Sequence, residues 1–135
     1  MQNVRTKNEV VAGAVAGGLT HVVKASRYSV AGLVSCFRNE TAVRIECILG
    51  IVHNVAAFTL PIGRPAALGL LFLWLLLLGA EVVNSAIEEV VDMVSPQWSE
   101  SAKRAKDYGS AAVFIMIVAI AAGWMFALAG LLQSS

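Results

Sequence analysis

Apolar residues follow one another in three long runs that are separated by charged segments. Between Cys47 and Gly63 only His53 can carry a charge. The segment Pro65 to Ala80 contains no acidic or basic residue, and neither does the chain after Asp107. A membrane-spanning helix needs about 20 mostly apolar residues. The pattern therefore predicts three spans, at residues 41–60, 66–91 and 108–132.

The segment 8–27 shows a different pattern. Its apolar residues gather on one side of a helix and its charged residues on the other, and the predicted helix is too polar to cross a membrane. Such a segment is typical of a helix that lies in the membrane interface. Between the first two spans, the short link 61–65 is rich in proline and glycine, which predicts an antiparallel helical hairpin.

Composition agrees with an all-α integral membrane protein that forms a single domain over residues 1–135. The chain is 58% hydrophobic and 14% charged, which is too apolar for an ordinary soluble domain. Of ten Lys and Arg residues, six lie before or at the start of the first span and three lie in the segment 96–107, which we interpret as a loop. By the positive-inside rule we expect this loop and the N-terminus in the cytoplasm.

Acidic residues follow the most apolar run directly. At about 100° per residue, Glu81, Glu88 and Asp92 fall within roughly 40° of one another on the second span, with Asn84 to one side. A charge at the bilayer centre costs about 2.5 to 3.5 kcal/mol, so such acids usually face a protein interior or an aqueous site. The alternative is that the helix leaves the membrane here and the later acids are simply hydrated.

Further acids and bases are predicted on the same membrane side in two groups. Around the entry to the first span these are Glu40, Glu46, Arg38 and Arg44, and before the third span they are Lys103, Arg104, Lys106 and Asp107. Carboxylates from two helices can bind magnesium, which completes its coordination with phosphate and water. Basic side chains bind phosphate groups directly. The combination suits transfer of a phosphoryl group from a soluble nucleotide to a lipid hydroxyl.

Two polar residues, His53 and Asn54, interrupt the first span. We interpret them as a hydrogen-bonded pair that joins helices, with a proton relay as the alternative. Trp74 and Trp124 are interpreted as packing residues.

Two segments of the chain are similar to a known family. The segment Glu81-Val-Val-Asn-Ser-Ala-Ile-Glu-Glu-Val-Val-Asp92 is followed, fifteen residues from Asp92 to Asp107, by Ala105-Lys-Asp-Tyr-Gly-Ser-Ala-Ala112. Both resemble the prokaryotic diacylglycerol kinase family. The resemblance implies a homotrimer with active sites shared between subunits, in the bacterial cytoplasmic membrane. It also implies Mg²⁺ as cofactor, ATP as co-substrate, diacylglycerol as acceptor and phosphatidic acid as product.

The resemblance also implies a role for individual residues. By this resemblance, Glu81 corresponds to the general base of the family, and Glu40 and Glu88 correspond to its metal ligands. The other residues are expected to support the site, contact the nucleotide or lie near the lipid head group: Asn84 and Asp92 for support; His21, Tyr28, Lys106 and Asp107 for the nucleotide; Glu46 and Ser110 for the lipid. His21 departs from the family pattern, which commonly has an arginine there.

The acceptor remains open between diacylglycerol and a polyprenol such as undecaprenol, because members of the family use either. Diacylglycerol is favoured, since the match to that branch runs without gaps from about Thr20 into the third span. A third alternative is a non-enzymatic membrane subunit or small transporter, in which acids and bases pair across helices.

Overall fold

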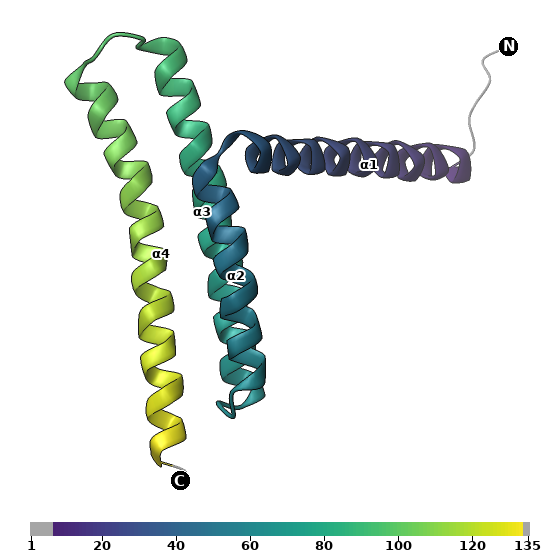
Figure 1. Cartoon of the computed structure of the whole chain (residues 1–135). Coiled ribbons are helices and arrows are strands. Elements are labelled where there is room, and N and C mark those ends of the chain that lie inside the picture. Colours follow the sequence, from purple (N-terminus) through teal and green to yellow (C-terminus); the bar gives the residue numbers. More distant parts are fainter. Residues whose placement is uncertain (1–6, 134–135) are drawn as a thin grey trace, which may run out of the picture. The chain divides into compact units, whose positions relative to one another are not determined.

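Four α-helices account for nearly all of the part of the chain that the structure describes. In the computed structural model these residues are 7–133, with side chains described at residue 18 and from residue 20 onward. The helices are α1 (Lys7–Asn39), α2 (Thr41–Thr59), α3 (Arg64–Val94) and α4 (Glu100–Gln133) (Figure 1). No strand occurs among residues 7–133, so the all-α prediction is confirmed. The chain divides into two units, Met1–Ser35 and Cys36–Ser135.

Three of these helices are long and apolar enough to cross a membrane. The most apolar 18-residue windows of α2, α3 and α4 have mean hydropathies of 1.4, 2.3 and 2.5. The three predicted spans are thus confirmed. The helix α1 is longer than the predicted 8–27, because it continues to Asn39. Ser26 and Ser29 do not interrupt it, since their hydroxyls donate to the carbonyls four residues earlier, at 2.9 and 3.1 Å.

A single extended residue, Glu40, separates α1 from α2. Arg44 closes the junction by donating through Nη1 to the carbonyl oxygens of Arg38, at 2.7 Å, and Phe37, at 3.3 Å. Its Nη2 donates to the Thr41 hydroxyl at 2.7 Å. The last carbonyls of a helix lack partners within it, so Arg44 supplies donors that α1 needs at its end.

The predicted hairpin between α2 and α3 is confirmed. Leu60 is extended, as a residue before proline usually is, and it ends α2. Gly63 has φ +84°, a left-handed conformation that glycine adopts without a steric penalty. Pro65 lies in the first turn of α3, where its missing N–H costs no hydrogen bond. These residues make the turn short and rigid.

The prediction of a loop over residues 96–107 is wrong, because α4 already begins at Glu100. The Ser99 hydroxyl accepts a hydrogen bond from the Ala102 N–H at 3.2 Å and so caps the helix. Ion pairs one helical turn apart then stabilise the polar first turns: Glu100 with Arg104 at 2.9 Å, and Lys103 with Asp107. Capping and ion pairing extend the helix beyond its apolar part.

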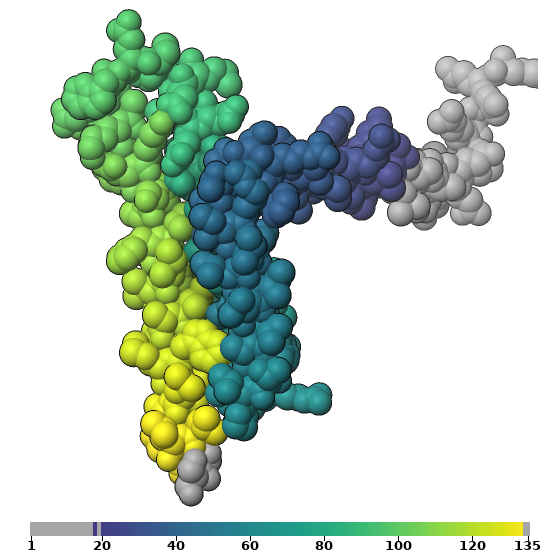
Figure 2. Space-filling view, in the orientation of Figure 1, coloured from purple at the N-terminus to yellow at the C-terminus, as the bar shows by residue number. Residues whose placement is uncertain are grey.

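Within the unit Cys36–Ser135, α3 packs against both α2 and α4 (Figure 1). Small and aliphatic side chains fill the contacts, with Ala57, Ala67 and Leu70 in one buried cluster and Leu77, Val113 and Ile120 in another. On the face that Figure 2 displays, α2 also touches the C-terminal half of α4. Most other large apolar side chains are exposed, as lipid-facing residues would be.

A polar cluster ties the three spans together near their middle. The Trp124 indole N–H of α4 donates to Nδ1 of His53 on α2, at 3.1 Å. Because Nδ1 accepts, the proton lies on Nε2, which contacts the carbonyl oxygen of Leu70 on α3 at 3.2 Å. The Trp74 ring lies 4.9 Å from the imidazole, centroid to centroid. The packing role predicted for both tryptophans is confirmed. Asn54 does not join helices as predicted, because its amide nitrogen donates to Gly50 of its own helix and its buried Oδ1 has no partner among the described residues.

Candidate active site

The acidic side of α3 is partly buried. Glu81 and Asn84 each expose only 7% of their surface, and Glu88 is partly buried one turn further on. Residues three or four apart share one side of a helix, so these three side chains line up along α3. Asp92 and Glu89 are exposed. The hydration alternative therefore fits Asp92, but it does not fit Glu81.

Asn84 lies at a close approach of α3 and α4. A Cβ atom on Gly109 of α4 would overlap the Asn84 side-chain oxygen, so only glycine fits at this position. The Asn84 amide nitrogen donates to Oε1 of Glu88 at 3.1 Å. Its carbonyl oxygen is buried and has no hydrogen-bond partner among the described residues. Asn84 therefore orients Glu88 and keeps one acceptor available.

Carboxylates from the start of α2 join those of α3. The charges of Glu40 and Glu88 both act on Glu81, and the charge of Glu81 acts on Glu46. Glu40 and Glu46 are both partly buried, and Oε2 of Glu46 is buried without a hydrogen-bond partner in the described chain. Acids of α2 and α3 therefore lie close enough for their charges to interact, whereas their position relative to the membrane stays a prediction. We refer to Glu40, Glu46, Glu81 and Glu88 as the acidic cluster.

No Lys or Arg of the described residues forms an ion pair with the acidic cluster. Arg44, the nearest basic residue in sequence to Glu46, donates instead to backbone carbonyls and to Thr41. Lys106 pairs with Asp92 at 2.6 Å, and Lys103 pairs with Asp107. Partly buried carboxylates without a counterion are costly. The cluster therefore requires a cation or protons from outside the described chain.

A magnesium ion fits the chemistry of these donors, because carboxylate oxygens are ligands that it prefers. Among the described residues, no group of three or more His, Cys, Asp or Glu side chains is gathered closely enough to hold a metal alone. Magnesium seldom uses such a complete protein cage, since it keeps several waters and binds substrate phosphates. Two carboxylates with a nucleotide would match that preference.

A second polar site lies where α3 ends and α4 begins. The Lys106–Asp92 pair bridges the two helices beside a cavity of about 320 Å³ that Trp98 and Lys103 also line. The bridge fixes the end of α3, which agrees with the supporting role expected of Asp92. It also positions the Lys106 ammonium group on the α3 side of α4.

The remaining predicted site residues are exposed. Ser110 follows Gly109 on α4. His21 and Tyr28 lie on α1 in the other unit, and Tyr28 exposes 75% of its surface. Their roles stay predictions. One contributor was not singled out from the sequence, Gly109. Arg44 is predicted among the acids and bases at the start of the first span, but it donates to the carbonyls at the end of α1 instead. Gly109 lies inside the family-like segment, which was the available signal, whereas nothing in the sequence indicates that Arg44 binds a helix end.

Three apolar spans and, near one end, an acidic cluster without ion-pair partners among the described residues define a small integral-membrane protein with a polar site. Comparison with known proteins shows to which family of membrane proteins the chain belongs. A model of the prokaryotic diacylglycerol kinase family matches residues 27–128. A diacylglycerol kinase of Haemophilus influenzae is 39% identical over 107 residues, which cover 79% of this chain and 91% of the relative.

Two further relatives agree. The diacylglycerol kinase of Pseudomonas aeruginosa is 39% identical over 113 residues, covering 84% of this chain and 92% of the relative. That of Escherichia coli K12 is 37% identical over 107 residues, covering 79% and 88%. This chain belongs to the prokaryotic diacylglycerol kinase family, as its two similar segments predicted.

Proposed function

We propose that this chain transfers the γ-phosphoryl group of ATP to the hydroxyl group of diacylglycerol, giving phosphatidic acid and ADP. Its three named relatives are diacylglycerol kinases, which favours this acceptor over undecaprenol. The observation that carries the proposal is the burial of Glu81 in an acidic cluster without a counterion, inside an apolar helix. A small transporter or a non-enzymatic subunit is not favoured by these relatives.

In this proposal Glu81 is the general base. Its carboxylate accepts the proton of the lipid hydroxyl as the O–H bond breaks. The hydroxyl oxygen forms a bond to the γ-phosphorus while the bond from that phosphorus to the ADP oxygen breaks, so that ADP leaves. The position of Glu81 supports this role, because it is buried at the end of the apolar run of α3, where a lipid head group would meet the protein.

Glu40 and Glu88 are proposed to hold Mg²⁺, as oxygen ligands from two helices. The bound ion would neutralise charge on the transferring phosphoryl group and on the leaving ADP. Asn84 would keep Glu88 in place through its amide, which donates to the Glu88 carboxylate at 3.1 Å. The buried carbonyl oxygen of Asn84 and Oε2 of Glu46 remain acceptors for groups that the substrates bring.

The other contacts follow from the expected roles. Lys106 and Asp107 are proposed to bind the nucleotide together with His21 and Tyr28 of α1. Glu46 and Ser110 are proposed to lie near the lipid head group. Histidine stands at position 21 where the family pattern commonly has an arginine, so we propose that the nucleotide contacts here differ from that pattern.

Three copies are proposed to assemble around shared sites in the bacterial cytoplasmic membrane, with the N-terminus and the acidic cluster on the cytoplasmic side. One copy buries few large side chains, and none of the described ones is fully enclosed. Partners from neighbouring copies would cover polar atoms such as the Asn84 carbonyl oxygen that one copy leaves unpaired.

The test is an assay of the purified chain in mixed micelles with Mg-ATP and either diacylglycerol or undecaprenol. We expect ADP release coupled to formation of phosphatidic acid. Phosphorylation of undecaprenol alone would move the chain to the polyprenol branch. No phosphorylated product with either lipid would contradict the kinase and favour a subunit or transporter.

A further inference from the structure

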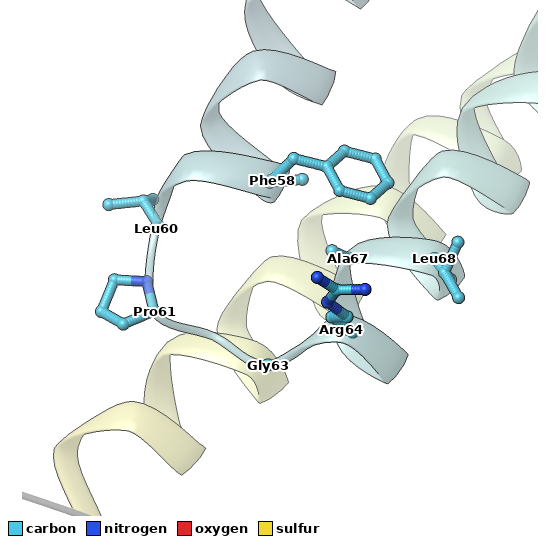
Figure 3. Close-up of a pocket in the computed structure, with 8 residues that line it drawn as sticks. Phe58, Leu60, Pro61, Gly63, Arg64, Ala67 and Leu68 are labelled. Atoms are coloured by element: carbon cyan, nitrogen blue, oxygen red, sulfur yellow. The ribbon is translucent and has the colours of Figure 1, made fainter.

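A separate cavity lies at the turn between α2 and α3. It measures about 590 Å³ and is lined by the end of α2, the turn and the first residues of α3 (Figure 3). Glu81 follows Arg64 by seventeen residues of continuous helix. At 1.5 Å per residue the two lie about 25 Å apart along α3, close to the thickness of a hydrocarbon layer. The turn cavity is therefore at the opposite membrane surface from the acidic cluster.

Arg64 is the one charged residue that lines this cavity. Figure 3 shows the Arg64 side chain at the start of α3, among the residues that line the cavity. No ion pair joins Arg64 to another described residue. The sequence explains why, since it contains no Asp or Glu from Cys47 to Ala80 or after Asp107. Neither of the helices that pack here offers this guanidinium a carboxylate.

The other walls of the cavity are apolar and accessible. Phe58, Leu60 and Leu68 expose 53%, 43% and 56% of their surfaces. The turn itself is conformationally restricted by Pro61 and by Gly63 with its φ of +84°. A fixed cationic group thus lies beside an apolar surface at the level where a bilayer changes from head groups to acyl chains.

We propose that the turn cavity binds an anionic phospholipid, with its phosphate on Arg64 and an acyl chain against Phe58 and Leu68. Guanidinium groups bind phosphate through two parallel hydrogen bonds, which an ammonium group does not reproduce. A second copy of this chain is a poorer occupant, because it too has no acidic side chain at this level of its spans. The phosphate of a lipid supplies the missing charge, and its chains cover the apolar walls.

The test is lipid binding to the purified full chain in neutral detergent, followed by native mass spectrometry with equal amounts of phosphatidylglycerol and phosphatidylcholine. We expect phosphatidylglycerol adducts to dominate. Arg64→Gln should lower them about fivefold, the effect of one interfacial cation. Arg64→Lys should give an intermediate loss. The matched control is Arg104→Gln, which removes an exposed arginine at the other membrane surface.

Equal binding of the two lipids by the native chain would overturn the proposal, and so would equal losses in the Arg64 and Arg104 variants. Displacement of phosphatidylglycerol by excess inorganic phosphate would also contradict it, because the acyl contacts would then add nothing. Kinase turnover of Arg64→Gln should stay at the native value in micelles. That readout separates a lost lipid site from a misfolded chain.

Discussion

Two polar clusters lie inside the same three-helix unit, and they differ in how completely their polar atoms are paired. In the middle of the spans, both ring nitrogens of His53 have partners, the Trp124 N–H and the Leu70 carbonyl oxygen. In the acidic cluster, Oε2 of Glu46 is buried without any partner among the described residues, and so is the carbonyl oxygen of the neighbouring Asn84. Outside both clusters, the same holds for Oδ1 of Asn54, next to His53 in the chain.

The difference indicates what each cluster is for. A buried polar group without a partner costs roughly 1 to 3 kcal/mol, so a cluster that is fully paired stabilises the fold whereas one that is not awaits a ligand or another subunit. The acidic cluster also brings together side chains whose charges have the same sign. Changes at the acidic cluster should therefore reduce activity, and changes at His53 and Trp124 should reduce stability.

The largest effect is expected for Glu81→Gln. Loss of a general base lowers turnover by about 10² to 10⁴-fold. Phosphatidic acid formation measures this loss, and nucleotide binding and thermal unfolding should stay near native. The control is Glu89→Gln, because Glu89 is exposed and does not lie on the acidic side of α3. This variant should retain full turnover. A Glu81→Gln rate close to that of the native chain in lipid vesicles would exclude Glu81 as the base.

Gly109→Ala should come next. The added Cβ would overlap the Asn84 side chain and displace it from Glu88. We expect turnover to fall about 10 to 100-fold, as for a small misplacement of a reacting group, together with about 1 to 3 kcal/mol of stability. Gly130→Ala is the control, since nothing lies within 4 Å of a Cβ there. Equal turnover in the two variants would show that the close approach has no catalytic importance.

Glu88→Gln should raise the magnesium concentration needed for half-maximal turnover by about tenfold, because a neutral amide is a weaker ligand than a carboxylate. The measurement is a magnesium titration of activity at saturating ATP. Turnover at high magnesium should recover in part, unlike that of Glu81→Gln. A titration identical to the native one would remove Glu88 from the proposed ligands.

Trp124→Phe tests the paired cluster. It removes the N–H that reaches His53 Nδ1 and should lower stability by about 0.6 to 1.7 kcal/mol, the range for hydrogen bonds between spans. Denaturant unfolding in mixed micelles measures this change. Trp98→Phe, at an 81% exposed residue, should change stability little. At denaturant concentrations too low to unfold it, Trp124→Phe should have the turnover of the native chain. A large loss of turnover under these conditions would contradict a purely structural role.

Asp92→Asn should have the smallest effect on stability. The Lys106–Asp92 pair is exposed, so its removal should cost no more than about 1 kcal/mol and less at high salt. If Asp92 positions Lys106 for the nucleotide, KM for ATP should rise while kcat changes little. Glu100→Gln breaks the exposed Arg104 pair within α4 and should leave KM unchanged. The same KM in both variants would count against the positioning role.

The three spans and the segments that carry the polar site could be predicted from the order of residues alone. The length of an apolar run predicts a membrane helix, because backbone groups without hydrogen bonds are excluded from lipid. A carboxylate such as Glu81 in an apolar helix is costly, which indicates a functional site. The hairpin followed from Pro61 and Gly63, whose backbone restrictions are local. The family followed from two segments that together carry several of the predicted site residues.

Which polar groups are paired depends on how the helices pack, and the sequence did not predict it. Helix periodicity places Glu81, Asn84 and Glu88 on one side of α3, but burial depends on which helix packs there and on Gly109 allowing it close. The same holds for Arg44, which binds a helix end rather than an acid, and for His53, whose partners come from two other helices. Partners far apart in sequence meet only through packing, so their contacts leave no local pattern to recognise.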